Sequence, residues 1–336
     1  MTISNYYPLS NDYWSGRVDS SSDYDAFRWH QWIETIDLRA YNKKCDTLGF
    51  CILGFCSEAG VLRNKGRAGT SKGPETIRKQ LANLPCHFTQ KVKLFDAGNI
   101  ICNDMHLESV QDALSKAVEK ILSCNLFPIL LGGGHGIALG HYKGLSNYYA
   151  KNNSKLGILN FDAHFDLRPY KLCGSSGTMF LQIADFCKNQ NIHYDYMCVG
   201  IQKRSNTIAL FKTAKNLNVK YILAKDMVDQ ELWPILEKID NFIKNQDHIY
   251  ITICADVFSA AFAPGVSAPS ALGLNPEQVI KILKYILRSG KSVSFDIAEV
   301  SPRFDKDHTT ANLAAVLIFS LVNTLSEING YNIDFI

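Results

Sequence analysis

Short apolar segments rich in β-branched and aromatic residues recur along this chain, at intervals that leave room for a helix. Eight of them are predicted to be strands: Gly49–Phe55, Val92–Asp96, Leu126–Leu131, Leu156–Phe161, Met197–Ile201, Val219–Leu223, Ile249–Cys254 and Ser292–Ile297. Parallel strands need long crossover connections, usually helices, so the alternation predicts a parallel sheet covered by helices on both faces. Periodicity does not separate a closed (β/α)8 barrel from an open sheet.

Helical periodicity fills several of the intervals. His106–Ser123, Asp229–Ile243 and Pro276–Leu287 each place apolar residues on one helix face. An early proline followed by an acidic residue marks helix starts at Gly73-Pro74-Glu75 and Asn275-Pro276-Glu277. No linker, repeat or low-complexity stretch divides the 336 residues. We therefore predict one domain over residues 1–336, with residues 1–45 as an N-terminal extension packed on it.

Charge and cysteine content narrow the class of protein. Lys and Arg number 35 against 32 Asp and Glu, which gives a net charge of +3 with no basic run. This near balance argues against a nucleic-acid or membrane surface and favours a small-molecule or protein partner. The ten cysteines are scattered without a zinc-type spacing. The first 14 residues are polar and aromatic, and no apolar run approaches the ~18 residues of a membrane span. These features predict a soluble cytoplasmic protein with reduced thiols.

Polar, metal-competent residues follow four predicted strands, where open α/β sheets place their ligands. The segments are Gly132-Gly133-Gly134-His135-Gly136, Asp162-Ala163-His164-Phe165-Asp166, Cys254-Ala255-Asp256 and Asp296-Ile297-Ala298-Glu299. An isolated Asp-x-His-x-Asp could as well be a helix cap beside a core histidine. Its combination with His135 and Asp256 favours a metal site, and mixed carboxylate and imidazole ligands suit Mn2+ or a similar divalent ion.

The triple glycine before His135 has two interpretations. It could cradle a phosphate, but it lacks the Lys-Ser/Thr of a P-loop and the Gly-x-Gly-x-x-Gly spacing of a dinucleotide site. We therefore expect a sharp backbone turn that presents His135.

The order of these motifs resembles the ureohydrolases, the family that contains arginase, agmatinase and formimidoylglutamase. The resemblance runs along nearly the whole chain and is closest to the formimidoylglutamase branch, at Trp14–Asp19, Arg28–Gln31, Gly60–Arg67, Asp166–Tyr170, Ser175–Thr178 and Ala263–Pro269. An arginase-like chain would carry a histidine where this one has Met179. The resemblance implies an arginase-like fold, a three-layer α/β/α arrangement with an open, mainly parallel sheet of about eight strands.

The resemblance also implies an activity, the hydrolysis of N-formimidoyl-L-glutamate to L-glutamate and formamide in histidine degradation. A hydroxide bridging two divalent metal ions, with Mn2+ expected, would attack the formimidoyl carbon. One metal would bind His135, Asp162, Asp166 and Cys254, and the other Asp162, His164, Cys254 and Asp256. Glu299 and Asp166 are the predicted catalytic residues, and Glu299 would hold the cationic amidine.

Two further expectations concern the substrate carboxylates and the assembly. The residues predicted to bind the carboxylates are Asn64, Arg67, Arg168, Ser175, Ser176 and Arg303. Among these, Arg168 is favoured because it lies two residues beyond Asp166 in the sequence. The family also implies a homo-oligomer.

Two positions depart from the family pattern. The first is beside His135, where Gly134 and Gly136 leave no flanking carboxylate, and the second is a metal ligand. The ligand at position 254 is usually an aspartate, and here it is Cys254. A thiolate is a soft ligand that favours zinc, iron or nickel over Mn2+. Three functions remain open: an active formimidoylglutamase, a hydrolase of another guanidine or amidine such as arginine or agmatine, and a metal-poor, weakly active relative with a binding or redox-regulated role.

Overall fold

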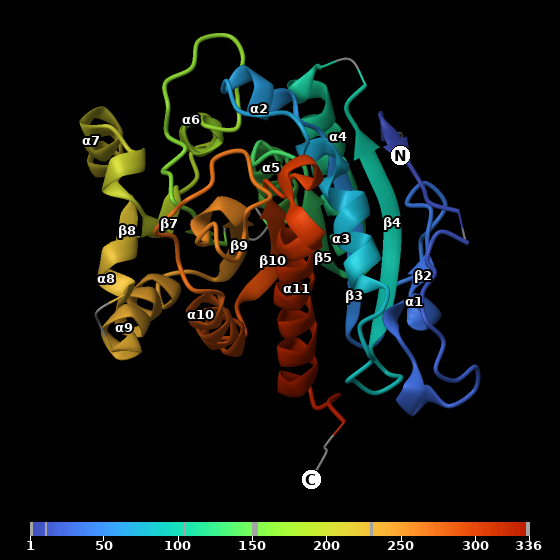
Figure 1. Cartoon of the computed structure of the whole chain (residues 1–336). Coiled ribbons are helices and arrows are strands. Elements are labelled where there is room, and N and C mark those ends of the chain that lie inside the picture. Colours follow the sequence, from blue (N-terminus) through green and yellow to red (C-terminus); the bar gives the residue numbers. More distant parts are fainter. Residues whose placement is uncertain (1–2, 11, 104, 150–153, 229–230, 334–336) are drawn as a thin grey trace.

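The computed structural model describes residues 3–10, 12–103, 105–149, 154–228 and 231–333. Their strands form one sheet flanked by helices (Figure 1). The strands are β1 (Tyr6–Tyr7), β2 (Glu34–Thr35), β3 (Gly49–Cys56), β4 (Lys93–Ile101), β5 (Phe127–Gly132), β6 (Leu156–Phe161), β7 (Asp195–Ile201), β8 (Lys220–Leu223), β9 (His248–Cys254) and β10 (Ser292–Ala298). Their order is β1-β4-β3-β5-β10-β9-β6-β7-β8, with β2 also paired to β4, and only the β1–β4 pair is antiparallel.

Helices cover both faces of this sheet. They are α1 (Trp29–Trp32), α2 (Ala59–Arg63), α3 (Gly73–Leu81), α4 (Leu107–Ser123), α5 (Ile137–Tyr149), α6 (Met179–Gln190), α7 (Ile208–Asn216), α8 (Ala224–Val228), α9 (Leu232–Ile243), α10 (Pro276–Arg288) and α11 (Thr309–Ile328). Buried side chains of α3, α9, α10 and α11 share one apolar core, and those of α4, α5 and α6 share a second.

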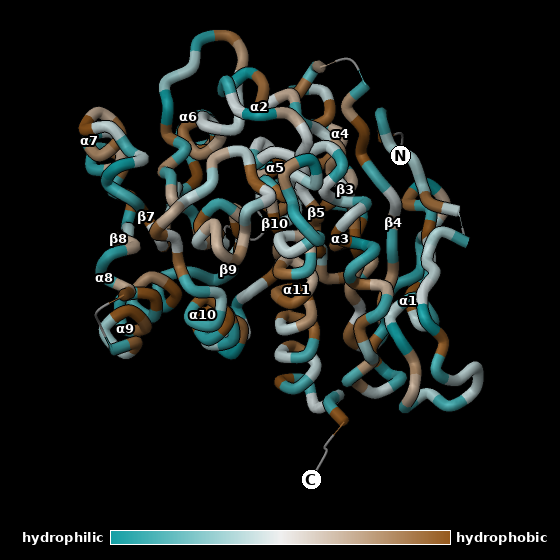
Figure 2. The backbone as a smooth tube through the Cα atoms, in the orientation of Figure 1, coloured by the Kyte–Doolittle hydropathy of each residue, from teal (hydrophilic) through white to brown (hydrophobic). Residues whose placement is uncertain are grey.

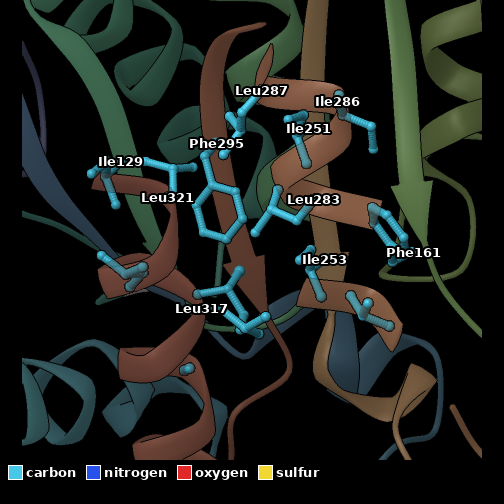
Figure 3. Packing of buried hydrophobic residues seen from close by; sticks show 14 of the residues in the cluster. Ile129, Phe161, Ile251, Ile253, Leu283, Ile286, Leu287, Phe295, Leu317 and Leu321 are labelled. Carbon is cyan, nitrogen blue, oxygen red and sulfur yellow. The ribbon is translucent and has the colours of Figure 1, made fainter. Parts of the chain in front are cut away.

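The side chains of each central strand alternate between these two cores. Ile251 on β9 lies in the core beneath α10 and α11, whereas its neighbour Tyr250 lies in the opposite core. Figure 3 shows Ile251 and Phe295 packed with Leu283 and Leu321 from the covering helices. Along α10, hydrophilic and hydrophobic residues alternate, as expected for a helix with one buried face (Figure 2). The predicted three-layer α/β/α fold is confirmed, and the open order of the strands excludes the barrel.

All eight predicted strands are present; β6 has its predicted ends, and the other seven are shifted at one or both ends. The largest difference is at β4, which continues past Asp96 to Ile101 and also pairs with the two short strands β1 and β2. Gly98 makes this continuation possible, because its φ is 86° and a Cβ there would lie 2.2 Å from the carbonyl oxygen of Tyr7. Strands of two residues are too short to leave a periodic pattern in the sequence.

The predicted helices are also found. α4 and α10 match their predicted segments closely, and α3 begins at Gly73 as its proline signal predicts. α9 begins at Leu232, and the predicted start at Asp229 lies outside the described residues.

α11 corrects one expectation. By length and composition it is apolar enough to cross a membrane, although no such stretch was expected. It contacts α3 and α10 (Figure 1). Its residues Ala314, Leu317 and Leu321 are fully buried. α11 is therefore a helix of the protein core.

The N-terminal segment is tied to β4 by polar contacts. The indole Nε1 of Trp14 donates to a carboxylate oxygen of Asp96, 3.1 Å away, and the same carboxylate binds the buried guanidinium of Arg78 on α3. α3 in turn lies against the functional edge of the sheet, because a Cβ at Gly73 would be 3.0 Å from the carbonyl oxygen of Gly132. The division into one domain with a 45-residue extension stays a prediction.

Candidate metal centre

Four neighbouring strands deliver the polar motifs to one edge of the sheet. β5, β10, β9 and β6 lie side by side and parallel, so their carboxyl ends meet at the same edge. Asp162 follows β6 directly, Cys254 ends β9, and His135 and Glu299 follow β5 and β10. The sequence prediction that these motifs converge is therefore correct.

A first group of ligand atoms lies around His135. Its Nδ1 is 3.0 Å from Oδ2 of Asp162 and 3.3 Å from Oδ2 of Asp166. The ligand atoms of His135, Asp162 and Cys254 all lie within 4.8 Å of one another. His135 is 1% exposed, and its Nδ1 makes no hydrogen bond of good geometry in the described structure. A buried nitrogen left in this way beside two carboxylates is placed to bind a cation.

A second group shares Asp162 with the first. The ligand atoms of Asp162, His164 and Asp256 also lie within 4.8 Å of one another. Nδ1 of His164 is 3.4 Å from Oδ1 of Asp162 and 3.4 Å from Oδ2 of Asp256. The donor set, mostly carboxylate oxygens and imidazole nitrogens, fits a pair of divalent cations that have Asp162 in common.

The charges in this centre perturb one another. Burial alone would lower the pKa of His135, but contacts with Asp162 and Asp166 outweigh it and raise that pKa well above the usual value. The pKa of His164 is raised in the same way, against burial, by Asp256 and Asp162. Burial opposes the shift at Asp162, yet the two histidines lower its pKa. The three shifts share one cause, the close approach of the two imidazoles to the carboxylates.

The remaining acids are shifted upward. Burial, reinforced by the charge of Asp162, raises the pKa of Asp166 to about 6. Burial and the charge of Asp256 raise the pKa of Glu299 to about 8, despite a hydrogen bond from the backbone of His135. Burial and the same carboxylates raise the pKa of the Cys254 thiol well above its usual value. Burial is the largest cause of each of these pKa shifts, the nearby carboxylates add to it, and a bound cation would oppose it.

The backbone around the two predicted catalytic acids is unusual. Asp166 has φ of 50° and Glu299 has φ of 68°. Both lie in the left-handed region, which residues other than glycine rarely adopt. Strain of this kind is found preferentially at functional sites.

The triple glycine acts by close packing. None of Gly132, Gly133 and Gly134 has a positive φ, so the expected sharp turn is not what requires them. A Cβ at Gly133 would lie 2.1 Å from the carbonyl oxygen of Ser57, which shows that only glycine fits. The N–H groups of Gly133 and Gly134 donate to Phe55 and Ser57, and that of His135 donates to Glu299. These three N–H groups are engaged, which excludes the phosphate-cradle interpretation.

A cavity of about 270 Å³ opens over the centre. His135, His164, Asp166, Cys254, Asp256 and Glu299 line it. Of the predicted substrate-binding residues, Asn64, Arg67, Arg168 and Ser176 line it as well. Ser175 and Arg303 are not among the lining residues. The Ser175 hydroxyl accepts from the N–H of Gly177 within its loop.

The two arginines of the cavity differ in freedom. Nε and Nη2 of Arg67 donate to the carbonyl oxygens of Ser267 and Val266, and its guanidinium lies 3.8 Å from the ring centre of Phe304. Across the described residues, nothing forms a hydrogen bond or ion pair with the Arg168 guanidinium. Arg168 is exposed and able to bind an anion at the cavity.

Several residues that line the cavity were not predicted as site residues, namely Val61, Lys65, Gly66, Ser205, Asn206, Leu210, Ser267 and Ala268. Lys65 lies between the predicted Asn64 and Arg67, so its position in that motif could have suggested it. Asn206 had no local signal. Its side chain accepts from the N–H of Phe165 and donates to the carbonyl of Ala163, which holds the loop that carries His164.

Known proteins share this architecture. The family model described as "Arginase family" matches residues 49–323. The formimidoylglutamase of Clostridium tetani (strain Massachusetts / E88) is 57% identical over 331 residues, covering 97% of this chain and 98% of that protein. The chain belongs to the arginase family.

Other arginase-family proteins extend the comparison. The formimidoylglutamase of Legionella pneumophila (strain Paris) is 45% identical, covering 96% of this chain and 98% of that protein. The crystal structure of formimidoylglutamase from Bacillus subtilis subsp. subtilis str. 168 has a TM-score of 0.79 at 24% identity and covers 93% of this chain and 96% of that one. Trypanosoma cruzi formiminoglutamase with Mn2+ has a TM-score of 0.75 at 22% identity, with 86% and 97% covered. These two structures share the fold of this arginase-family chain.

Proposed function

We propose that this chain hydrolyses N-formimidoyl-L-glutamate to L-glutamate and formamide, a reaction of histidine degradation, with two divalent metal ions, expected to be Mn2+. The main support for this proposal is the buried Glu299 carboxylate, which faces a cavity lined by the candidate metal ligands. Whole-length similarity to proteins named formimidoylglutamase supports the same substrate.

Glu299 has the geometry of an amidine holder. One oxygen, Oε1, accepts the N–H of His135 at 2.8 Å, which fixes the carboxylate. In the described part of the chain the other oxygen has no hydrogen bond, so it can accept from a cationic amidine. Burial raises the pKa of Glu299, and an amidinium placed against it favours the charged carboxylate.

The metal pair would be held by His135, Asp162, Asp166 and Cys254 on one side and by Asp162, His164, Cys254 and Asp256 on the other. Two divalent ions in such a site lower the pKa of bound water enough to supply a nucleophile near neutral pH. Asp166 lines the cavity with its Oδ2 3.3 Å from Nδ1 of His135, so the two side chains can bind the same metal ion.

The substrate carboxylates require donors at the outer part of the cavity. The Arg168 guanidinium has no partner among the described residues, and Asn64 and Ser176 line the same cavity. Two nitrogens of the Arg67 guanidinium donate to backbone carbonyls at Val266 and Ser267. Only its remaining N–H groups can donate to a substrate carboxylate. Arg168 is therefore the principal carboxylate partner in this proposal, and Ser175 and Arg303 have weaker support.

The activity is tested with purified protein loaded with Mn2+. Formamide release from N-formimidoyl-L-glutamate is expected, and the Glu299→Gln variant, which retains an oxygen for the His135 N–H, is expected to bind Mn2+ but to lose turnover. Release of urea from arginine or agmatine, without formamide from N-formimidoyl-L-glutamate, would replace the proposed substrate. No product from any of the three at any metal loading would refute a hydrolytic function.

Three more general proposals accompany this function. A single domain carries it, in a homo-oligomer as the family resemblance implies. A cytoplasmic location agrees with the ten cysteines, none of which forms a disulfide within the described residues. Light scattering after size-exclusion chromatography measures the oligomeric state directly.

A further inference from the structure

A chain of buried hydrogen bonds runs from the candidate metal centre into the middle of the sheet. Asp296 on β10 is fully buried and pairs in register with Thr252 on β9. Its Oδ1 accepts from the Thr252 hydroxyl at 2.5 Å, and its Oδ2 accepts from the hydroxyl of Tyr250 and from Nδ1 of His141 at 2.6 Å. The same Thr252 hydroxyl lies 3.0 Å from Nε2 of His135. None of these contacts is needed for the substrate roles described above.

The donors and acceptors along this chain fix its direction. Three donors converge on the two oxygens of Asp296, which is the arrangement of an ionised carboxylate that only accepts. The Thr252 hydroxyl has a single O–H, which donates its hydrogen bond to Asp296. In its hydrogen bond with His135 the hydroxyl oxygen can therefore only accept. Nε2 of His135 therefore carries a proton, and in the neutral ring Nδ1 has the free lone pair.

That lone pair points at the metal centre. Nδ1 is the atom that lies 3.0 Å from Asp162 and 3.3 Å from Asp166. The imidazole of His135 also packs against Phe180 in a T-shaped arrangement, with the two ring centres 5.6 Å apart. The Phe180 ring is itself stacked on Tyr196. The ring is thus held by one hydrogen bond and one aromatic contact, with only Nδ1 facing the acidic ligands.

We propose that Thr252 and Asp296 are positioning residues, which select the tautomer and orientation of His135 that bind a metal ion. This inference rests on the proposed metal pair. Outer partners of metal-binding histidines commonly act in this way, because they fix the tautomer and raise the basicity of the ligand. Here the outer partner is a hydrogen-bonded relay, in which the Thr252 hydroxyl connects His135 to Asp296. The Asp296 carboxylate is held in place by hydrogen bonds from Tyr250 and His141.

Two substitutions test the direction of the relay. Thr252→Val keeps the shape of the side chain and removes the acceptor for Nε2–H. Asp296→Asn is nearly isosteric, and its amide oxygen is held by the two donors at the Oδ2 position, Tyr250 and His141. Its NH2 group then faces Thr252, which must accept from it and donate to His135. This reversal moves the imidazole proton to Nδ1, where it blocks the metal.

The measurement is calorimetric titration of metal-free protein with Mn2+, together with thermal unfolding in chelator. We expect Thr252→Val and Asp296→Asn each to weaken Mn2+ binding about 10- to 100-fold, the usual effect of removing such a partner. Thr252→Ser, which restores the hydroxyl, should bind Mn2+ within about threefold of the unmodified protein, well inside that range. Ser294→Ala is the matched control, because Ser294 is a fully buried hydroxyl on the same face of β10 with no hydrogen-bond partner in the described structure.

The outcomes separate the two proposals. If the unmodified protein binds no Mn2+, the metal pair is wrong and the positioning role is overturned with it. If the unmodified protein binds Mn2+ and both variants bind it equally well, or lose only thermal stability, the relay is structural and the positioning role alone is overturned. Asp296→Asn guards against a folding failure of Thr252→Val, because it retains the size and polarity of the original side chain.

Discussion

The buried ion pair between Arg78 and Asp96 gives a sharp stability prediction. Nε and Nη2 of Arg78 donate to the two oxygens of Asp96 at 2.7 and 2.9 Å, and both side chains are at most 1% exposed. Arg78 also donates to the carbonyl of Gly98 and to the side chain of Asn99. This pair joins α3 to β4, and the first residue of α3 packs against the glycine segment that presents His135.

The expected magnitude follows from what each substitution leaves behind. Arg78→Met leaves the Asp96 carboxylate buried, and among the described residues the Trp14 indole and the Gly98 N–H are then its remaining donors. Breaking a buried pair in this way costs roughly 3–5 kcal/mol in the free energy of unfolding. Asp96→Asn alone leaves the guanidinium without its counter-charge. When both are replaced, no buried charge remains, so the double variant should be more stable than Arg78→Met.

Urea unfolding of the four proteins, followed by circular dichroism, forms a double-mutant cycle. We expect a favourable coupling of at least about 2 kcal/mol, toward the upper part of the range seen for residues in one network. Lys79→Met is the control, because Lys79 is exposed and its pair with Glu75 is worth at most about 1 kcal/mol. A loss below about 1 kcal/mol for Arg78→Met, or strictly additive effects, would refute the reasoning.

Three further predictions concern the site. Arg168→Ala should lower kcat/KM for N-formimidoyl-L-glutamate about tenfold by raising KM, as expected for the loss of one charge-assisted hydrogen bond. Arg303→Ala, measured in the same kinetic assay, should change kcat/KM less than about twofold. Cys254→Asp should shift metal preference from Zn2+ toward Mn2+ in competitive titrations, because it replaces a soft ligand by a hard one; unchanged selectivity would contradict this. Removal of the metal by a chelator should lower thermal stability. Mn2+ at about 100 times its dissociation constant should restore about 2.7 kcal/mol of the free energy of unfolding.

Local signals explain what the sequence predicted well. Asn275 was expected to begin a helix, and its side-chain oxygen does accept the N–H of Glu277 at 2.8 Å. The ligands were found because they directly follow apolar strands, and parallel strands end at one edge whatever their order in the sheet. Both inferences need only residues that are close together in the sequence.

Long-range contacts explain what it could not predict. The side chain of Asn206 reaches the loop of His164 from another element, and nothing near it in the sequence marks that contact. His141 and Asp296 are 155 residues apart, so the relay behind His135 exists only once β10 and α5 are packed together. The sequence favoured Arg168 over Arg303 as a carboxylate partner, and of these two only Arg168 lines the cavity. In the fold, Arg303 instead packs beside Phe304 and Gly69.

Cys254 shows how one ligand can change the chemistry of a site while the sheet keeps its geometry. The residue ends β9, and its pairing with Ala298 of β10 fixes where its side chain enters the centre. The side chain delivered there is a thiol whose pKa burial and nearby carboxylates raise, so a metal must displace its proton to bind sulfur. A soft ion gains more from that bond than Mn2+ does. We therefore expect metal preference to follow residue 254, while substrate choice follows Glu299 and Arg168, which lie on other elements.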